Sequence, residues 1–334
     1  IARGGEAAIR TVVGDGRLLA KIYLADRSAI EEKLRAMRDH PPADPAGVPG
    51  HSAIAWPREL LYDDRRRLIG YLMPHIRGAV PILDVLNPRR RASTLPAFGL
   101  AYLHRCARNL ASALHALHDT RVVAGDLNER NVLVTPRALV TLIDADSFQI
   151  QRFRPAEIIV YPCPVGRAEY TPPELQGQPF RDTLRLPEHD AFGLAVLIFQ
   201  LLMAGSHPFR GAWLGPGEAA PLEEKIRRGW FPYAQRPGAP VAPPPKPEAP
   251  KPAPAPRTDG AKSEAAKPDV KAEPPKADAP KPETPKPAPA PVAKPVAPPP
   301  PTGPTPPVPP RRGRSMGWIA IVVGVGVVAL VCVV

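Results

Sequence analysis

The chain has 334 residues with a formal net charge of +12, 50 prolines and 3 cysteines. Three cysteines without CxxC spacing argue against a disulfide framework and a structural metal, and they favour a reducing compartment. The basic residues are scattered over loops and the proline-rich part, and no zinc-finger, basic-helix or aromatic RNA-binding motif accompanies them. The composition therefore argues against nucleic acid as a partner.

The proline content divides the chain into two different parts. Of the 50 prolines, 29 lie between Pro237 and Pro310, in a stretch without any aromatic residue, Leu or Ile. Such a stretch cannot bury enough apolar surface to offset the entropy of ordering it, so we expect residues 236–314 to form a disordered linker. Residues 1–235 hold nearly all the aromatic residues and are long enough for a substantial core.

The segment 315–334 predicts a membrane-spanning helix. From Met316 onward it is uncharged and apolar, and it is long enough to cross a bilayer. The positive-inside tendency places the globular part in the cytoplasm, since three arginines precede the segment: Arg311, Arg312 and Arg314. We therefore expect a single-pass protein of the cell membrane. Because the chain begins with Ile1 and stops inside the apolar run, we also expect it to be truncated.

The first part of the globular region predicts strands and one helix. Within residues 1–25, two apolar segments flank a glycine-containing turn at 14–16, which indicates a β-hairpin with Lys21 in its second strand. Residues 27–38 carry apolar side chains at helical spacing. Residues 53–73 contain two more short apolar segments separated by a charged turn. This pattern predicts a small β-rich lobe, about residues 1–77.

The second part is predicted to be mainly helical. Residues 98–120 form a long amphipathic pattern, and residues 188–205 form an apolar helix that is more typical of a buried core than of a membrane span. Between them, two short apolar strands are expected within 125–148. The larger lobe, about 78–235, is therefore predicted to hold a short hairpin between helices.

Three oxygen-bearing side chains flank this hairpin. Asp126 and Asn131 precede its first strand, and Asp144 follows its second. Carboxylate and amide oxygens suit Mg²⁺, which usually takes its other ligands from water and phosphate oxygens. Positive charge and backbone N–H groups for the phosphates could come from Lys21 and the Gly4-Gly5 loop.

These motifs resemble those of a bacterial protein-kinase-like domain, in kinase order over nearly all of residues 1–235. By this resemblance, Lys21 is similar to the strand lysine that holds the α- and β-phosphates. Asp126 matches the catalytic-loop Asp that accepts the proton of the substrate hydroxyl. Asn131 and Asp144 match the two metal-binding residues.

Two further motifs extend the resemblance. In the segment CPVGRAEYTPPEL, Glu174 takes the position of the APE glutamate, at the end of a peptide-binding platform. Asp190 opens an Asp-x-x-Gly motif, which implies a structural role beneath the catalytic loop. The resemblance implies an α+β, two-lobe fold and an enzyme that uses ATP and Mg²⁺, or Mn²⁺, to phosphorylate Ser or Thr of protein substrates.

The chain departs from the family pattern at several positions. Ala124-Gly125 replaces the His-Arg of the catalytic loop, so the Arg that reads a phosphorylated activation segment is absent. Asn128, which we group with Asp126 as a catalytic-loop residue, replaces a lysine that would face the γ-phosphate. The DFG motif reads Asp144-Ala145-Asp146, which adds a second carboxylate near the metal position.

The nucleotide-binding loop and the partner of Lys21 also differ. Of the glycine-rich loop only the middle glycine is kept, so Gly4 and Gly5 would allow the close approach of backbone to phosphates. A glutamate from the 27–38 helix should pair with Lys21. Glu31 flanks the apolar face of that helix and is favoured over Glu32.

The main hypothesis is a membrane-tethered, cytoplasmic Ser/Thr protein kinase that works in bacterial signalling. Two alternatives are a pseudokinase scaffold that binds nucleotide without turnover, favoured by the altered motifs, and a small-molecule kinase, favoured by Gly125-Asp126. The linker contains PxxP-like spacings that could dock on proline-binding domains, although most such stretches are spacers. Three histidines on the 98–120 helix lack a second cluster that would complete a metal site (His104, His115 and His118).

Overall fold

The computed structural model describes residues 2–3, 5–234 and 236–244. The predicted membrane-spanning helix, nearly all of the predicted linker and Gly4 lie outside these residues. Among the helices that the structure does describe, none combines the length and the apolar character needed to cross a membrane.

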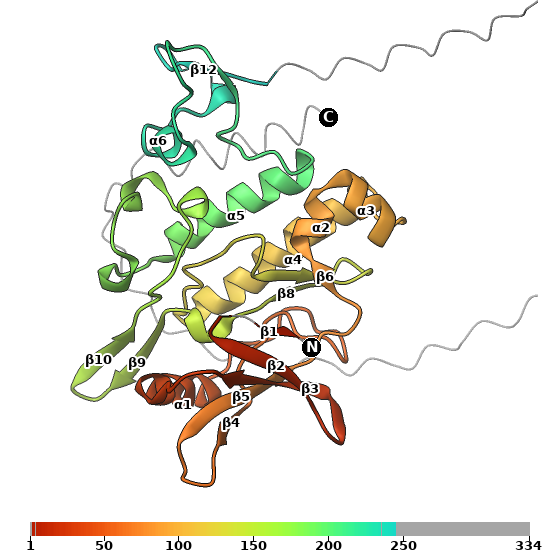
Figure 1. Cartoon of the computed structure of the whole chain (residues 1–334), viewed down its shortest axis with the longest axis vertical. Helices are drawn as coiled ribbons and strands as arrows, with labels where there is room; N and C mark the ends of the chain where they lie inside the picture. Colours follow the sequence, from red (N-terminus) through yellow and green to blue (C-terminus); the bar gives the residue numbers. More distant parts are fainter. Residues whose placement is uncertain (1, 4, 235, 245–334) are drawn as a thin grey trace, which may run out of the picture. The chain divides into compact units, whose positions relative to one another are not determined.

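The small lobe is built on a five-stranded antiparallel sheet (Figure 1). The predicted hairpin is confirmed, because β2 and β3 pair across a turn in which Gly14 has a φ of 83°, a conformation that suits glycine. The spatial order of the strands is β1 (Ala2–Arg3), β2 (Ala7–Val12), β3 (Asp15–Tyr23), β5 (Leu68–Pro74) and β4 (Glu59–Tyr62).

One helix accompanies this sheet, as predicted. A 3₁₀ turn at Ser28–Ile30 leads into α1 (Glu31–Asp39), whose buried side includes Leu34 and Met37. The indole Nε1 of Trp56 donates to the Met37 carbonyl at 2.7 Å, which fixes the end of the helix to the following loop. The strand expected near residue 53 begins only at Glu59, because the preceding residues pack as an irregular segment into the core.

Two long helices form the centre of the large lobe, close to the predicted bounds. They are α4 (Leu100–Asp119) and α5 (Pro187–Leu202). Their apolar faces share one core, to which Leu110, Leu117 and Leu197 contribute fully buried side chains. Shorter helices that the sequence pattern did not predict complete the lobe: α2 (Ile82–Leu86), α3 (Pro88–Thr94) and α6 (Leu222–Arg227).

The hairpin predicted within 125–148 is confirmed. It consists of β7 (Val132–Val134) and β8 (Val140–Leu142), which pair antiparallel, and the short β6 (Val80–Pro81) extends them. A second hairpin, not predicted, follows directly: β9 (Ile150–Arg154) and β10 (Glu157–Tyr161). The result is a mixed α+β architecture with several small sheets and two long helices.

The described fold continues past the boundary predicted at residue 235. β11 (Ala212–Trp213) pairs antiparallel with β12 (Val241–Ala242), and the Val241 side chain is buried. The first residues of the segment predicted to be a linker thus include a short strand that pairs with the preceding part of the chain.

Candidate functional site

The β7–β8 hairpin brings Asn131 and Asp144 to the same edge. Val132 is paired with Leu142, so the residues just outside the hairpin face each other, and the Ile143 N–H donates to the Asn131 carbonyl at 2.9 Å. This register places the chain immediately before Asp144 alongside Asn131. The hairpin thus brings the backbone at Asn131 and the backbone just before Asp144 together at one end.

Asp126 is held by two amide groups. Nδ2 of Asn128 donates to its Oδ1 at 2.8 Å, and Nδ2 of Asn131 donates to its Oδ2 at 3.0 Å. Burial raises the pKa of the Asp126 carboxyl, while the hydrogen bonds from the two amides act in the opposite direction. A carboxylate that is oriented through both oxygens and has a raised pKa is suited to accept a proton.

Asn128 is a buried residue that supports Asp126. It is only 2% exposed, its Nδ2 also donates to the Asp126 carbonyl, and its Oδ1 accepts from the Arg130 N–H at 2.9 Å. Among the described residues, its side-chain hydrogen bonds all lie within its own loop, so it orients Asp126. It does not replace the positive charge of the family's lysine.

Lys21 reaches across from the small lobe to two carboxylates. Its Nζ lies 2.5 Å from Asp144 Oδ1 and 2.6 Å from Asp146 Oδ1. Asp144 adopts a left-handed backbone conformation, with a φ of 64°, which is uncommon outside glycine but tolerated by Asp. The Asp144 side chain remains 45% exposed and so is open to a further ligand, whereas Lys21 is largely buried.

The Asp146 carboxylate accepts hydrogen bonds from three side chains. Besides Lys21, the hydroxyl of Tyr23 donates to Oδ2 at 2.8 Å and that of Tyr71 donates to Oδ1 at 2.9 Å. Burial acts to raise the pKa of the Asp146 carboxyl, but the charge of Lys21 and these hydrogen bonds outweigh it and lower the pKa. Asp146 is therefore a buried anion with full hydrogen-bonding support.

The expected pairing of Lys21 with a glutamate of α1 is wrong. Glu31 binds Arg35 at 2.6 Å and accepts from the Tyr62 hydroxyl at 3.2 Å. Glu32 points to the β9–β10 hairpin, where Arg154 lies 3.4 Å away. Neither forms an ion pair with Lys21, because the rotation of α1 directs Lys33 toward the site and both glutamates toward other partners.

Lys33 is the α1 residue that reaches the site, and sequence reasoning missed it. It is 4% exposed, and its Nζ donates to the main-chain carbonyl of Asp146 at 2.7 Å. Burial lowers the pKa of Lys33 to about 8. Its position four residues before the buried Met37 was the available signal, since such residues share a helix face.

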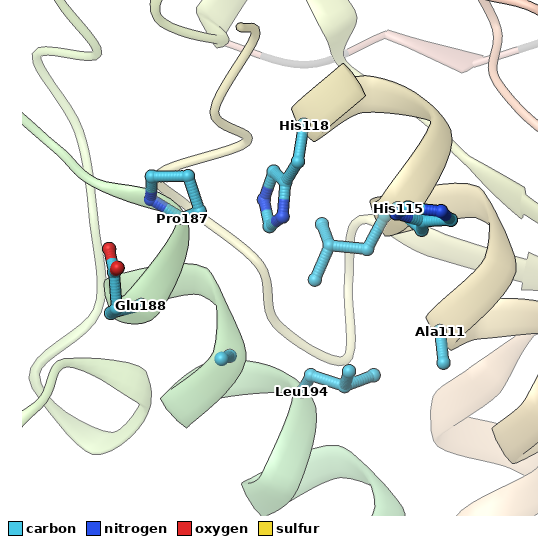
Figure 2. Close-up of a pocket in the computed structure, with 8 residues that line it drawn as sticks. Ala111, His115, His118, Pro187, Glu188 and Leu194 are labelled. Atoms are coloured by element: carbon cyan, nitrogen blue, oxygen red, sulfur yellow. The ribbon is translucent and has the colours of Figure 1, made fainter. Parts of the chain in front are cut away.

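Asp190 holds the loop that carries Asp126. Its carboxylate accepts from the N–H groups of Ala124 and Gly125 at 2.7 and 2.8 Å, and His118 Nε2 lies 2.9 Å from Oδ2. Figure 2 shows His118 extending from α4 toward the start of α5, beside a groove of about 290 Å³ whose lining also includes His115. This groove is lined by none of the residues around Lys21 and Asp126.

The absence of an arginine at position 125 has a steric explanation. Gly125 has a φ of 71°, and a Cβ there would lie 2.7 Å from the Cβ of Cys163. A larger residue therefore does not fit. Arg185 instead enters from elsewhere in the chain: its guanidinium donates to the Gly125 carbonyl at 3.0 Å and to that of Val165 at 3.3 Å. It links the loop that carries Asp126 to the segment around Val165.

The remaining predicted residues that the structure describes, Glu174 and Gly5, are exposed to solvent. Glu174 is exposed in the 3₁₀ turn Pro173–Leu175 and forms no ion pair with any other described residue. Gly5 is exposed, and a Cβ added to it would meet no atom within 4 Å. Its small size is therefore not required by neighbouring protein atoms.

Asn131 and Asp144 are the two residues whose oxygens could contribute to a metal site. Within the described residues, no three His, Cys, Asp or Glu side chains gather so that they could hold a metal ion. The carboxylate of the partly exposed Asp144 and the amide oxygen of Asn131 are of the donor types that Mg²⁺ prefers, and Mg²⁺ usually takes its other ligands from water and phosphate.

Comparison with known proteins points in the same direction. No protein-family model matches the chain. The protein kinase YegI of Escherichia coli (strain K12) is 35% identical over 252 residues, which cover 74% of this chain and 37% of YegI, and the YegI of Escherichia coli O157:H7 is similar to the same extent. The chain thus spans little more than a third of these relatives. The similarity supports a bacterial protein-kinase-like domain in this chain.

Proposed function

We propose that this domain transfers the γ-phosphoryl group of ATP to Ser or Thr hydroxyls of proteins. The observation that carries the proposal is the orientation of the Asp126 carboxylate by Asn128 and Asn131. Lys21 and Asp144, in contact at 2.5 Å, supply the cation and the carboxylate that a nucleotide site needs. The similarity to protein kinases supports the same class of reaction.

Each of these residues has one role in the proposed reaction. The acceptor hydroxyl attacks the γ-phosphorus, its proton passes to the Asp126 carboxylate, and the bond to the β–γ bridging oxygen breaks to release ADP. Lys21 would hold the α- and β-phosphates. Asn131 and Asp144 would hold Mg²⁺, which when bound neutralises charge on the phosphates. The raised pKa of Asp126 brings its proton affinity closer to that of a base working near neutral pH.

The location of the domain is a separate proposal. The apolar segment 315–334 and the arginines before it support a single-pass membrane anchor with the kinase domain in the cytoplasm. The proline-rich linker would then act as a spacer between them, in a signalling protein. Recovery of the full chain in the membrane fraction, and its release when residues 315–334 are deleted, would support this arrangement.

A pseudokinase is the second candidate, and a specific feature favours it. Lys21 already has two carboxylate partners at 2.5 and 2.6 Å, and Asn128 offers no charge to a γ-phosphate. If nucleotide binding did not free Lys21 from Asp144, the site would hold nucleotide without transferring phosphate. The proposed kinase requires that Asp144 can exchange Lys21 for a metal.

The fate of labelled phosphate distinguishes these functions. The full 334-residue chain is incubated with γ-labelled ATP and Mg²⁺, then with Mn²⁺, alone and with a generic Ser/Thr protein substrate. The proposal expects label on Ser or Thr of protein. ATP consumption with label only on small molecules would indicate a small-molecule kinase. Stabilisation by Mg-ATP without any turnover would indicate the pseudokinase.

A further inference from the structure

Three donors around Asp146 come from one patch of the small-lobe sheet. Lys21 and Tyr23 are two residues apart on β3, so their side chains lie on the same face. Tyr71 on β5 is the direct cross-strand partner of Lys21. The pairing of β3 with β5 therefore builds a cluster of one cation and two hydroxyls, and all three donate to the Asp146 carboxylate at 2.6 to 2.9 Å.

A fourth donor attaches the helix to the same residue. Lys33 of α1 is buried and donates to the Asp146 carbonyl at 2.7 Å. The α1 helix thus presents a cation to the site where the kinase pattern leads one to expect a carboxylate. The acidic partner of Lys21 lies in the segment after β8 instead. Relative to the kinase pattern, the helix therefore carries the cation and the segment after β8 carries the carboxylate that pairs with Lys21.

The two carboxylates around Lys21 differ in their surroundings. The Asp146 side chain is 10% exposed and is bound on both oxygens. That of Asp144 is 45% exposed, and among the described residues it is hydrogen-bonded to Lys21 alone. A metal and a nucleotide could draw Asp144 away from Lys21 without disturbing the buried cluster. The Asp146 carboxylate has no comparable freedom, because moving it would break hydrogen bonds from three side chains.

We infer that Asp146 is the residue that positions Lys21 for nucleotide phosphates, in place of a glutamate on α1, and that Lys33 couples α1 to it. The inference rests on the proposed function, because it assigns Lys21 to a nucleotide. Asp146 acts through Lys21 and is a positioning residue. Glu31 and Glu32, whose carboxylates bind arginines elsewhere, have no part in it.

The test measures binding and turnover in the full chain. The dissociation constant for Mg²⁺ with a non-hydrolysable ATP analogue, and kcat and KM for ATP, are determined for wild type, Asp146→Asn, Asp146→Glu and Glu31→Gln. Loss of a charged hydrogen-bond partner is expected to weaken analogue binding in Asp146→Asn by about 10- to 100-fold. KM should rise more than kcat falls, Asp146→Glu should recover part of the loss, and Glu31→Gln should change binding by less than about twofold.

A double-mutant cycle separates positioning from folding. If Asp146 acts through Lys21, Asp146→Asn should weaken binding by less than about twofold when it is introduced into Lys21→Met. If Asp146→Asn does not fold, Tyr23→Phe replaces it in the test. This variant is milder, because it removes one hydroxyl donor to Asp146 and no charge. It should weaken binding by about threefold to tenfold.

Two results would overturn the inference, and they can be told apart. In the first, wild type binds the analogue and transfers phosphate normally, but Asp146→Asn and Tyr23→Phe bind it within twofold of wild type, or the loss of binding appears in Glu31→Gln instead. This result would refute the positioning role of Asp146 and leave the proposed function intact. Wild type that neither binds the analogue nor transfers phosphate would refute the proposed function together with the inference.

Discussion

Lys33 gives the site a residue whose charge state affects stability in a defined pH window. Its pKa is lowered by burial to about 8 in the folded chain, against an ordinary value of 10.5. Between these values the unfolded chain binds more protons than the folded chain, so folding becomes more favourable as pH rises. Below pH 8 both states carry the charge and the burial cost is present in full.

We therefore predict that wild type becomes more stable relative to Lys33→Met as pH rises from 8 to 10.5. The relative gain should reach about 3 kcal/mol, since each unit of pKa shift corresponds to about 1.4 kcal/mol. Urea unfolding at a series of pH values measures it. Cys163, Asp146 and Lys21 surround the position in both chains, so their contributions to the pH dependence largely cancel. Parallel stability curves for the two chains would refute the assignment.

The positions of single residues could be predicted from sequence where one local element fixes them. A short hairpin fixes Asn131 and Asp144 relative to each other, and their positions beside its strands indicated that they share one edge. The partner of Lys21 was not predictable in this way. It depends on the rotation of α1, on which Glu32 and Lys33 are adjacent but point to different partners. It also depends on the cross-strand pairing of Lys21 with Tyr71.

At the scale of elements, the contact between α4 and α5 supports the loop that carries Asp126. His118 of α4 is 19% exposed and lies 2.9 Å from Asp190, which begins the Asp-x-x-Gly motif on α5. His115, one turn earlier on the same helix, is 77% exposed and only approaches Asp119. His115 therefore serves as a solvent-exposed control for the partly buried His118.

We predict that His118→Ala destabilises the fold by about 1–3 kcal/mol, because a buried carboxylate loses a hydrogen-bond partner. His115→Ala should change the unfolding free energy by less than about 0.5 kcal/mol. Chemical denaturation of both variants at the same pH makes the comparison. Equal effects of the two substitutions would contradict the role given to His118 in holding Asp190.

Long periodic helices were predictable from sequence, and short elements were not. α4 and α5 have enough turns for an apolar pattern or an apolar run to stand out. The β9–β10 hairpin has no such signal, because it exposes large apolar side chains such as Phe153 and Ile158 while it is held by backbone pairing. Helices of five to seven residues, such as α2 and α3, give too few repeats to be recognised.

At the scale of the whole molecule, the end of the fold depends on β12. Val241 is 8% exposed, and its strand pairs with β11 more than twenty residues earlier in the chain. Composition placed this strand in the linker, since it lies among prolines. Only the long-range pairing with β11 shows that it belongs to the folded unit.

A chain that ends at residue 235 should accordingly be less stable than one that ends at residue 244. Loss of the buried Val241 side chain and of the strand pairing should cost about 1–3 kcal/mol. Thermal unfolding of the two chains tests this, and a chain from 1 to 244 with Val241→Ser separates the side chain from the backbone pairing. Identical melting temperatures for the two lengths would show that β12 contributes nothing.

The central claim is that Asp126 is the base of a phosphoryl transfer. Its most direct test is the single-turnover rate of transfer from γ-labelled ATP and Mg²⁺ to protein, in wild type, Asp126→Asn and Asp64→Asn. Asp64 is an exposed turn residue and controls for loss of a carboxylate elsewhere. We predict that Asp126→Asn slows transfer by about 10²- to 10⁴-fold while Asp64→Asn matches wild type. Transfer at the wild-type rate in Asp126→Asn, or no transfer in any of the chains, would contradict the account.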